Sequence, residues 1–129
     1  MMQVSKEVRS ASQVVLDYLT AFYSADFDTA RSLIADDFSF RGPFLQIEGG
    51  DAFFQGAAGL ASIVRGYQLV RQWQDGDDVS SVYEVNLETP AAKGTVLMSE
   101  WSTVRDGQLT VSRVVFDTAA FRALVPPRP

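Results

Sequence analysis

The chain has 129 residues and a formal net charge of −5, with 11 Lys and Arg against 16 Asp and Glu. This length suits one domain and leaves too little chain for two sizeable ones. We therefore interpret residues 1–129 as a single domain, with an ordered core over about 8–124 and a flexible tail over 125–129. The acidic balance argues against nucleic acid as a partner, because phosphate binding needs clustered cations and no basic stripe is present.

Cysteine and histidine are both absent from the sequence. Their absence excludes a disulfide scaffold, a thiolate nucleophile, Ser-His-Asp catalysis and metal sites built on imidazole or thiolate, and we expect neither a metal nor a cofactor. Any proton transfer must use carboxylates, tyrosine, lysine or water. No segment approaches the roughly 18 apolar residues of a membrane span, so we expect a cytoplasmic protein without a membrane partner.

Helical periodicity dominates the start of the chain. Apolar side chains recur there at spacings of three and four, and these are Val8, Ala11, Val15, Leu19 and Phe22. This spacing predicts an amphipathic helix with a broad apolar face, which Ser10 and Gln13 can cap. Asp26 can cap a second, shorter helix, and we interpret Asp36-Asp37 as a solvated turn that closes it.

Glycine and proline interrupt the regular secondary structure predicted for the next segment. The run Phe38-Ser39-Phe40 alternates as a strand does, and Gly42-Pro43 interrupts it. Gly49-Gly50 then precedes a third predicted helix, which we extend as far as Val64. That helix contains Gly56 and Gly59, which disfavour helix, so we expect another element to approach closely over them.

The second half of the chain changes from helical to strand periodicity. Four runs are rich in β-branched and aromatic residues, and they cover 67–74, 79–87, 95–104 and 109–116. Asp75-Gly76 and Asp106-Gly107 lie between runs as hairpin turns do, and a last helical turn is expected over 118–124. Helices followed by a run of strands favour an α+β fold, in which three helices cover one face of a curved, mostly antiparallel sheet.

Several segments occur together in the order and spacing of a known family. They are 15–22 (VLDYLTAF), 25–28 (ADFD), 33–38 (LIADDF), Gly42-Pro43, 49–54 (GGDAFF), 105–109 (RDGQL) and 115–117 (VFD). Over about residues 10–120, this series resembles a nuclear transport factor 2-like domain. The resemblance implies a cone-shaped, cystatin-like fold with a deep pocket between helices and sheet, and commonly a homodimer joined through the outer sheet face.

That family includes ketosteroid isomerase, polyketide cyclases of the SnoaL type, epoxide hydrolases and non-catalytic modules, so the fold alone does not give the function. The first helix is similar to that of ketosteroid isomerase, whose catalytic tyrosine falls on Tyr18 and whose oxyanion-hole acid falls near Glu100. The general base of that enzyme falls on Gly42, which has no carboxylate. Steroid isomerisation by the standard route is therefore not expected.

Tyr18 and Glu100 are the candidate catalytic residues. Tyr18 shares the apolar face of the first helix with Phe22, and its hydroxyl can reach a cavity; the alternative is a core tyrosine that binds one backbone carbonyl. Glu100 lies on a mostly apolar strand face, where burial raises a carboxyl pKa and suits it to acid or base chemistry near neutral pH. The alternative is an ion pair between Glu100 and Arg71 or Arg113 on the outer sheet face.

The aromatic residues are numerous enough to line a pocket for a small hydrophobic molecule. The candidate ligand-binding residues are Phe22, Phe38, Phe40, Phe44, Phe54, Trp73, Tyr83, Met98, Arg113 and Phe116. Packing alone also produces aromatic stripes, and Arg113, which alternates with Leu109 and Val111, also suits a cross-strand ion pair.

Two functions are consistent with the sequence. The first is a domain that binds a small hydrophobic ligand and carries out isomerase- or cyclase-type chemistry, with Tyr18 and Glu100 in oxyanion or proton-transfer roles. The second is a non-catalytic dimerisation or protein-interaction module whose pocket is filled by its own side chains.

Overall fold

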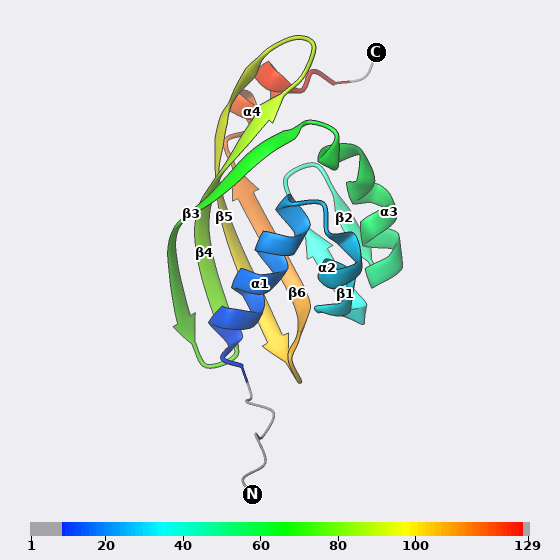
Figure 1. The fold of residues 1–129 in the computed structure, drawn as a ribbon, viewed down its shortest axis with the longest axis vertical. Coiled ribbons are helices and arrows are strands. Elements are labelled where there is room, and N and C mark those ends of the chain that lie inside the picture. The colour runs from blue at the N-terminus through cyan, green and yellow to red at the C-terminus, as the bar shows by residue number, and fades with distance from the viewer. Residues whose placement is uncertain (1–8, 128–129) are drawn as a thin grey trace, which may run out of the picture.

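The computed structural model of the protein describes residues 9–127. Within them the six strands form one sheet in the order β2-β1-β6-β5-β4-β3. Helices α1, α2 and α3 cover one face of this curved sheet, and α4 lies beyond its far end near the C-terminus (Figure 1). The predicted α+β architecture, with three helices on a mostly antiparallel sheet, is confirmed.

Side chains cap the N-termini of three of the four described helices, α1, α2 and α4, whereas α3 begins after Gly49. The helices are α1 (Ala11–Tyr23), α2 (Phe27–Ser32), α3 (Gly50–Ala61) and α4 (Thr118–Leu124). The Ser10 hydroxyl accepts the N–H of Gln13 at 3.2 Å, and the Asp26 carboxylate accepts that of Thr29 at 3.4 Å. Side-chain acceptors at these positions satisfy amide donors that the first helical turn leaves free. Both predicted caps are confirmed.

The two predicted Asp-Gly turns join β3 to β4 and β5 to β6. The strands are β1 (Ile34–Arg41), β2 (Gln46–Glu48), β3 (Val64–Asp75), β4 (Asp78–Glu88), β5 (Lys93–Arg105) and β6 (Gln108–Phe116). The β1–β6 pair is parallel and the other neighbours are antiparallel. Gly76 and Gly107 have φ of 61° and 77°, which glycine adopts without steric cost and which the two turns require.

Two predicted boundaries are wrong. Asp36 and Asp37 are not a turn but exposed residues of β1. The chain enters the sheet earlier because Ile34 already pairs with Leu109, whose N–H donates to the Leu33 carbonyl at 2.8 Å. The third helix also ends earlier, at Ala61, and Val64 opens β3 instead.

The close approach expected over the glycines of the third helix is present at Gly56 and wrong at Gly59, where a Cβ atom would have no neighbour within 4 Å among the described residues. A Cβ atom at Gly56 would lie 3.1 Å from Cδ1 of Ile47 in β2. That separation is tighter than ordinary van der Waals contact, so the missing side chain lets α3 sit against the edge of the sheet.

Side chains along the central strands alternate between buried and more exposed, and the buried ones face the helices. In β5, Met98 and Glu100 are buried, whereas Leu97 and Trp101 are exposed on the opposite face. In β4, Tyr83 is fully buried between its half-exposed neighbours. This period of two is that of a strand with one face on the core, and it positions an acidic group inside the domain.

An irregularity in β6 changes which residues point inward. Val104 pairs with Leu109, but the preceding Thr103 pairs with Val111, so β6 holds one extra residue here. Beyond this bulge Ser112 is buried, and Arg113 lies on the outer face. A bulge of this kind shifts the alternation of inward and outward side chains by one residue. The sequence alternation suggested that Arg113 shares a face with Leu109, and the bulge makes this prediction wrong.

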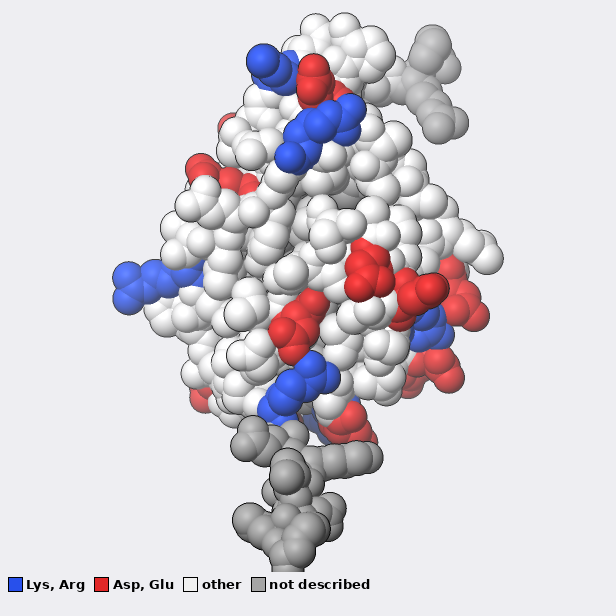
Figure 2. Space-filling view, in the orientation of Figure 1, with Lys and Arg blue, Asp and Glu red and all other residues white. Residues whose placement is uncertain are grey.

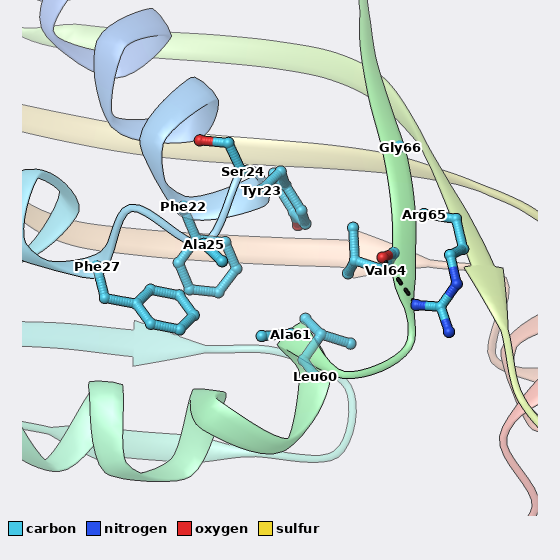
Figure 3. A pocket seen from close by; sticks show the side chains of 10 residues that line it. All are labelled: Phe22, Tyr23, Ser24, Ala25, Phe27, Leu60, Ala61, Val64, Arg65 and Gly66. Carbon is cyan, nitrogen blue, oxygen red and sulfur yellow. Dashed lines mark hydrogen bonds between the residues drawn. The ribbon is translucent and has the colours of Figure 1, made fainter.

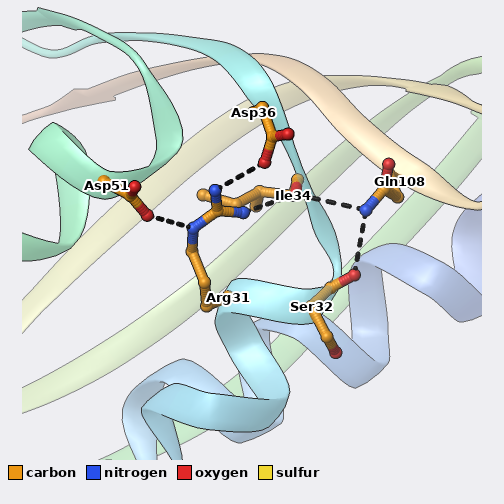
Figure 4. A network of polar contacts seen from close by, with 6 residues as sticks. All are labelled: Arg31, Ser32, Ile34, Asp36, Asp51 and Gln108. Atoms are coloured by element: carbon orange, nitrogen blue, oxygen red, sulfur yellow. Dashed lines mark hydrogen bonds and ion pairs between the residues drawn. The ribbon is translucent and has the colours of Figure 1, made fainter.

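A polar network joins α2 to α3 and β1 (Figure 4). Arg31 donates to Asp51 at 2.9 Å, to Asp36 at 2.7 Å and to the Ile34 carbonyl at 3.1 Å. Gln108 of β6 donates to the carbonyls of Ser32 and Ile34. The segment between α2 and β1 is thus fixed from both sides.

The C-terminal segment remains in contact with the core after α4. The N–H of Val125 donates to the Phe121 carbonyl at 2.8 Å, and the Val125 side chain packs against the core. Residues 128–129 of the predicted tail, and Val8 at the predicted start of the core, lie outside the described residues. None of the described helices is both long and apolar enough to cross a membrane. No continuous basic stripe crosses the helical face shown in Figure 2.

Candidate functional site

A cavity of about 540 Å³ lies between the helices and the inner face of the sheet. Its lining is mostly apolar, and the aromatic side chains in it are Tyr18, Phe22, Tyr23, Phe40, Phe44, Phe53, Tyr83, Phe116 and Phe121. Among the described residues, only Glu100 and Arg122 line it with charged side chains. This volume and composition are typical of a small-molecule site.

The cavity has a buried floor and an open mouth. Tyr18, Tyr83 and Glu100 are at most 4% exposed and form the floor. Phe44 and Leu45, in the loop between β1 and β2, are 46% and 44% exposed and lie at the mouth. A ligand that enters past this loop passes apolar walls before it reaches the polar groups at the bottom.

A second, smaller pocket of about 220 Å³ adjoins the cavity. Figure 3 shows Phe22 and Tyr23, at the end of α1, facing Leu60 at the end of α3 and Val64 at the start of β3. Phe22, Tyr23 and Leu60 also line the cavity. Tyr23 therefore stands between the two spaces.

Glu100 is held at the floor by neutral donors. The Tyr83 hydroxyl donates to Oε1 of Glu100 at 2.6 Å, and the Ser112 side chain also hydrogen-bonds to the carboxylate. No Lys or Arg of residues 9–127 pairs with it. A carboxylate offers about four acceptor sites, so acceptor capacity remains for a ligand.

The expected alternative for Glu100, an ion pair on the outer face, is wrong. The guanidinium of Arg71 lies 5.4 Å from the centre of the Trp73 ring, and that of Arg113 lies 4.0 Å from the Trp101 ring. Both arginines thus contact tryptophan on the face of the sheet opposite to Glu100.

Burial raises the pKa of the Glu100 carboxyl above its ordinary value of 4.5, and the hydrogen bonds from Tyr83 and Ser112 partly offset this rise. Removal from water penalises the charged form. A carboxyl with a raised pKa exchanges protons closer to neutral pH than an exposed one does, which is the property of a general acid or base.

All four tyrosines of the chain surround Glu100. The hydroxyls of Tyr23 and Tyr83 lie 3.2 Å apart, and the Tyr67 ring stacks on that of Tyr23 with 5.1 Å between centres. Burial and the nearby Glu100 charge raise the pKa of Tyr67 to about 12, and the same two causes raise the pKa of Tyr18, Tyr23 and Tyr83. These hydroxyls therefore remain protonated and are able to donate hydrogen bonds.

The fold brings eight of the predicted site residues to the cavity. They are Tyr18, Phe22, Phe40, Phe44, Tyr83, Met98, Glu100 and Phe116. The Tyr18 hydroxyl makes no hydrogen bond within residues 9–127, although the sequence left open a buried tyrosine bonded to a backbone carbonyl. Its donor is therefore available at the floor beside Glu100.

Two predicted wall residues pack against other aromatic rings instead: Phe38 lies in the core and Phe54 is half-buried. Phe38 is fully buried with its ring centre 5.2 Å from that of Phe53. Phe54 packs on Phe22 and Phe27. Phe38 is packed under Phe53 of α3, and Phe54 belongs to α3 itself, so neither ring lines the cavity.

Trp73 and Arg113 also lie elsewhere, on the outer face of the sheet. Trp73 is 50% exposed, since the register of β3 shifts between Leu69 and Arg71 and reverses the inward phase. Arg113 is turned outward by the bulge in β6. Strand alternation predicts a face only while the register is regular.

Several lining residues were not singled out from the sequence. Tyr23 lies four positions after Leu19, so the helical spacing that placed Leu19 on the apolar face is the signal that could have found it. Arg122 and Phe121 belong to the C-terminal helix α4, and only the tertiary packing of this helix brings them to the cavity. Among residues 9–127, no three metal-ligating side chains come together.

The arrangement combines one carboxyl with several phenol donors in a mostly apolar space. A single carboxyl can remove a proton from a bound molecule and return it at another atom. Neighbouring hydroxyls can stabilise the oxyanion that forms in between. No second carboxylate lines the cavity within the described chain, and Gly42 stands at its lip without a side chain.

The chain is similar to known proteins both in sequence and in fold. Residues 15–112 match the model of the SnoaL-like domain. No curated protein sequence matches the chain significantly. Among solved structures, a protein from Kribbella flavida is 28% identical, with a TM-score of 0.76 over 85% of this chain and 88% of the other.

Two further structures share the fold. A LEH-like epoxide hydrolase from M. tuberculosis is 24% identical, with a TM-score of 0.78 over 89% of each chain. An NTF2-like protein from Burkholderia thailandensis is 18% identical, with a TM-score of 0.81 over 93% of this chain and 100% of the other.

Proposed function

Because the chain belongs to the SnoaL-like domain family, we propose that it binds a small hydrophobic molecule in the cavity and catalyses an isomerase- or cyclase-type proton transfer on it. The observation that carries this proposal is Glu100, a buried carboxyl without a cationic partner in the described chain, at the floor of an apolar cavity. An uncompensated buried acid is costly for stability, so its presence favours a functional role.

Glu100 acts in this proposal as the group that takes and returns the proton. The carbonyl or hydroxyl oxygen of the ligand lies beside Tyr18, whose hydroxyl donates to it as negative charge develops. Tyr83 keeps the carboxyl in place through the 2.6 Å hydrogen bond. The signature of this chemistry is exchange of an acidic C–H proton of a bound ketone with solvent.

The apolar lining determines which molecules fit. Nine aromatic rings border the space, so a flat ring system gains more from burial there than a flexible polar molecule does. A cavity of about 540 Å³ is large enough for a fused-ring compound. We therefore expect ligands with a planar apolar body and one oxygen that can reach the floor.

Binding of 2-naphthol, measured by calorimetry, tests the ligand-binding part. Glu100→Gln is expected to weaken binding about tenfold or more, since a hydrogen bond to a carboxylate is replaced by one to a neutral amide. Ala57→Leu places a larger side chain from α3 into the cavity and is expected to abolish binding while the protein stays folded. Equal affinity in the wild type and both variants would contradict the proposal.

A matched control lies outside the cavity. Glu84 is a half-exposed glutamate of β4 that does not line it, and Glu84→Gln makes the same chemical change as Glu100→Gln. Its affinity for 2-naphthol is expected to equal that of the wild type. This comparison separates an effect of position from an effect of net charge.

The outer face of the sheet supports a second proposal, a homodimer. Trp73, Ser80, Trp101 and Arg113 form one row across four strands, and both tryptophans are about half exposed. Exposed apolar patches of this kind mark interaction surfaces. Light scattering of the wild type and of Trp101→Glu tests it: the wild type is expected to be dimeric and the variant monomeric. A monomeric wild type would contradict it.

A further inference from the structure

Arg122 is the one cationic side chain that lines the cavity within residues 9–127. It lies in the last turn of α4, and its guanidinium carbon is 4.0 Å from the centre of the Phe44 ring. No carboxylate of the described chain forms an ion pair with it. Its position over the ring leaves its N–H donors available to a ligand.

Arg122 and Glu100 occupy different ends of the cavity. Arg122 stands beside Phe44, which is 46% exposed at the mouth, whereas Glu100 is buried at the floor. Phe116 and Phe121 pack beside Phe44, with 5.1 to 5.9 Å between ring centres, and fix this side of the mouth. The cavity therefore has an apolar middle with a cation at its entrance and an acid at its base.

A guanidinium at the mouth of such a cavity suits a carboxylate. Its planar fork binds carboxylates through two parallel hydrogen bonds. The chain carries a net charge of −5, so its overall field repels an anionic ligand. A local cation at the entrance offsets that repulsion and holds the anionic group away from Glu100.

We propose that the ligand is an anionic aromatic molecule, with a carboxylate that Arg122 binds at the mouth and a hydroxyl or carbonyl oxygen that reaches Glu100 and Tyr18 at the floor. This inference rests on the proposed function, because it names the substrate class of the same cavity. Arg122 is then the residue that selects acids over their neutral analogues.

A pair of ligands that share a ring system and differ at one group, an anionic carboxylate in one and its neutral methyl ester in the other, tests this selection. The pair is 6-hydroxy-2-naphthoic acid and its methyl ester, which share a ring system and a hydroxyl. The wild type is expected to bind the acid about tenfold or more tightly than the ester, measured by calorimetry at pH 7.5 and low salt. Arg122→Gln is expected to bring this ratio close to one, and Arg122→Lys to retain part of it.

Arg71→Gln is the matched control. Arg71 also lies against an aromatic ring, that of Trp73, but on the outer face, so the acid-to-ester ratio is expected to stay at the wild-type value. The inference is overturned if the wild type shows no preference for the acid, or if Arg122→Gln weakens acid and ester equally, as the loss of a merely structural contact with Phe44 would.

Neutral 2-naphthol distinguishes failure of this inference from failure of the proposed function. If the wild type binds 2-naphthol but shows no preference for the acid, the cavity is a ligand site and only the role of Arg122 is overturned. If neither 2-naphthol nor the acid binds, the proposed function is itself contradicted, and this inference falls with it.

Discussion

The hydroxyl of Tyr83 donates a 2.6 Å hydrogen bond to Oε1 of Glu100, and both side chains are buried against the cavity. The two residues lie on neighbouring strands, where Tyr83 pairs with Met98 and Glu100 pairs with Ser81. The bond thus runs diagonally between adjacent rows of the sheet. It fixes one oxygen of the carboxyl and leaves the group oriented toward the ligand space.

Tyr83→Phe is expected to lower the free energy of unfolding by about 1–3 kcal/mol, because it removes a buried donor to Glu100 and leaves Tyr23 without its 3.2 Å partner. Urea denaturation of the variant and the wild type measures the difference. The lost hydrogen bond also raises the pKa of Glu100 further, since this bond favours the charged form.

Tyr67→Phe is the control for that substitution. The Tyr67 hydroxyl is buried and has no hydrogen-bond partner among the described residues, so its removal deletes an unsatisfied polar group. We expect a change in unfolding free energy within about 0.5 kcal/mol of zero, or a small stabilisation. A loss equal to that of Tyr83→Phe would show that ring packing, not the hydrogen bond to Glu100, governs both.

Glu100→Gln is expected to change how stability depends on pH. The pKa of Glu100 is higher in the folded state than its usual 4.5, so its contribution is fully present below pH 4.5 and is lost as the pH rises through the folded-state value. Glutamine is neutral at every pH, so the variant does not lose stability in this way as the pH rises. Its side chain still accepts the hydrogen bond from Tyr83. The stability of the variant relative to the wild type should therefore increase from pH 4.5 upward in thermal melts. A difference that stays constant with pH would refute the raised pKa.

Arg31→Gln is expected to lower the unfolding free energy by about 1 kcal/mol, since Arg31 links α2 to Asp36, to Asp51 and to the Ile34 carbonyl. The value is small because both aspartates are highly exposed, and water screens such pairs. Arg65→Gln is the control, because its pair with Glu88 at 3.5 Å is half-exposed on both sides. Equal effects on urea denaturation would show that the network adds nothing.

The sequence is sufficient to predict the elements of this fold because their signals are local. Capping residues such as Ser10 and Asp26, the period of two in the later strands and the Asp-Gly turns each act within a few residues. The regular alternation of β5 from Val96 to Ser102 likewise places Glu100 on one face with Val96 and Met98, but the sequence left open whether that face is the inner or the outer one.

The rest of the site depends on register and on long-range contacts. Arg113 was assigned to a possible ligand face because no local signal marks the bulge that turns it outward. Arg122 lies in a short C-terminal helix, and its place at the cavity follows from how α4 packs over Phe44. The tyrosine cluster likewise joins residues from α1, β3 and β4, which only the tertiary fold brings together.

The most direct test of the central claim is proton exchange on a bound ketone. Incubation of 2-tetralone with the protein in deuterated buffer, followed by NMR, measures how fast its acidic C–H protons are replaced. We expect the wild type and Glu84→Gln to accelerate this exchange over buffer alone, and Glu100→Gln to show no acceleration. Equal exchange with the wild type, with Glu100→Gln and without protein would contradict a role for Glu100 in proton transfer.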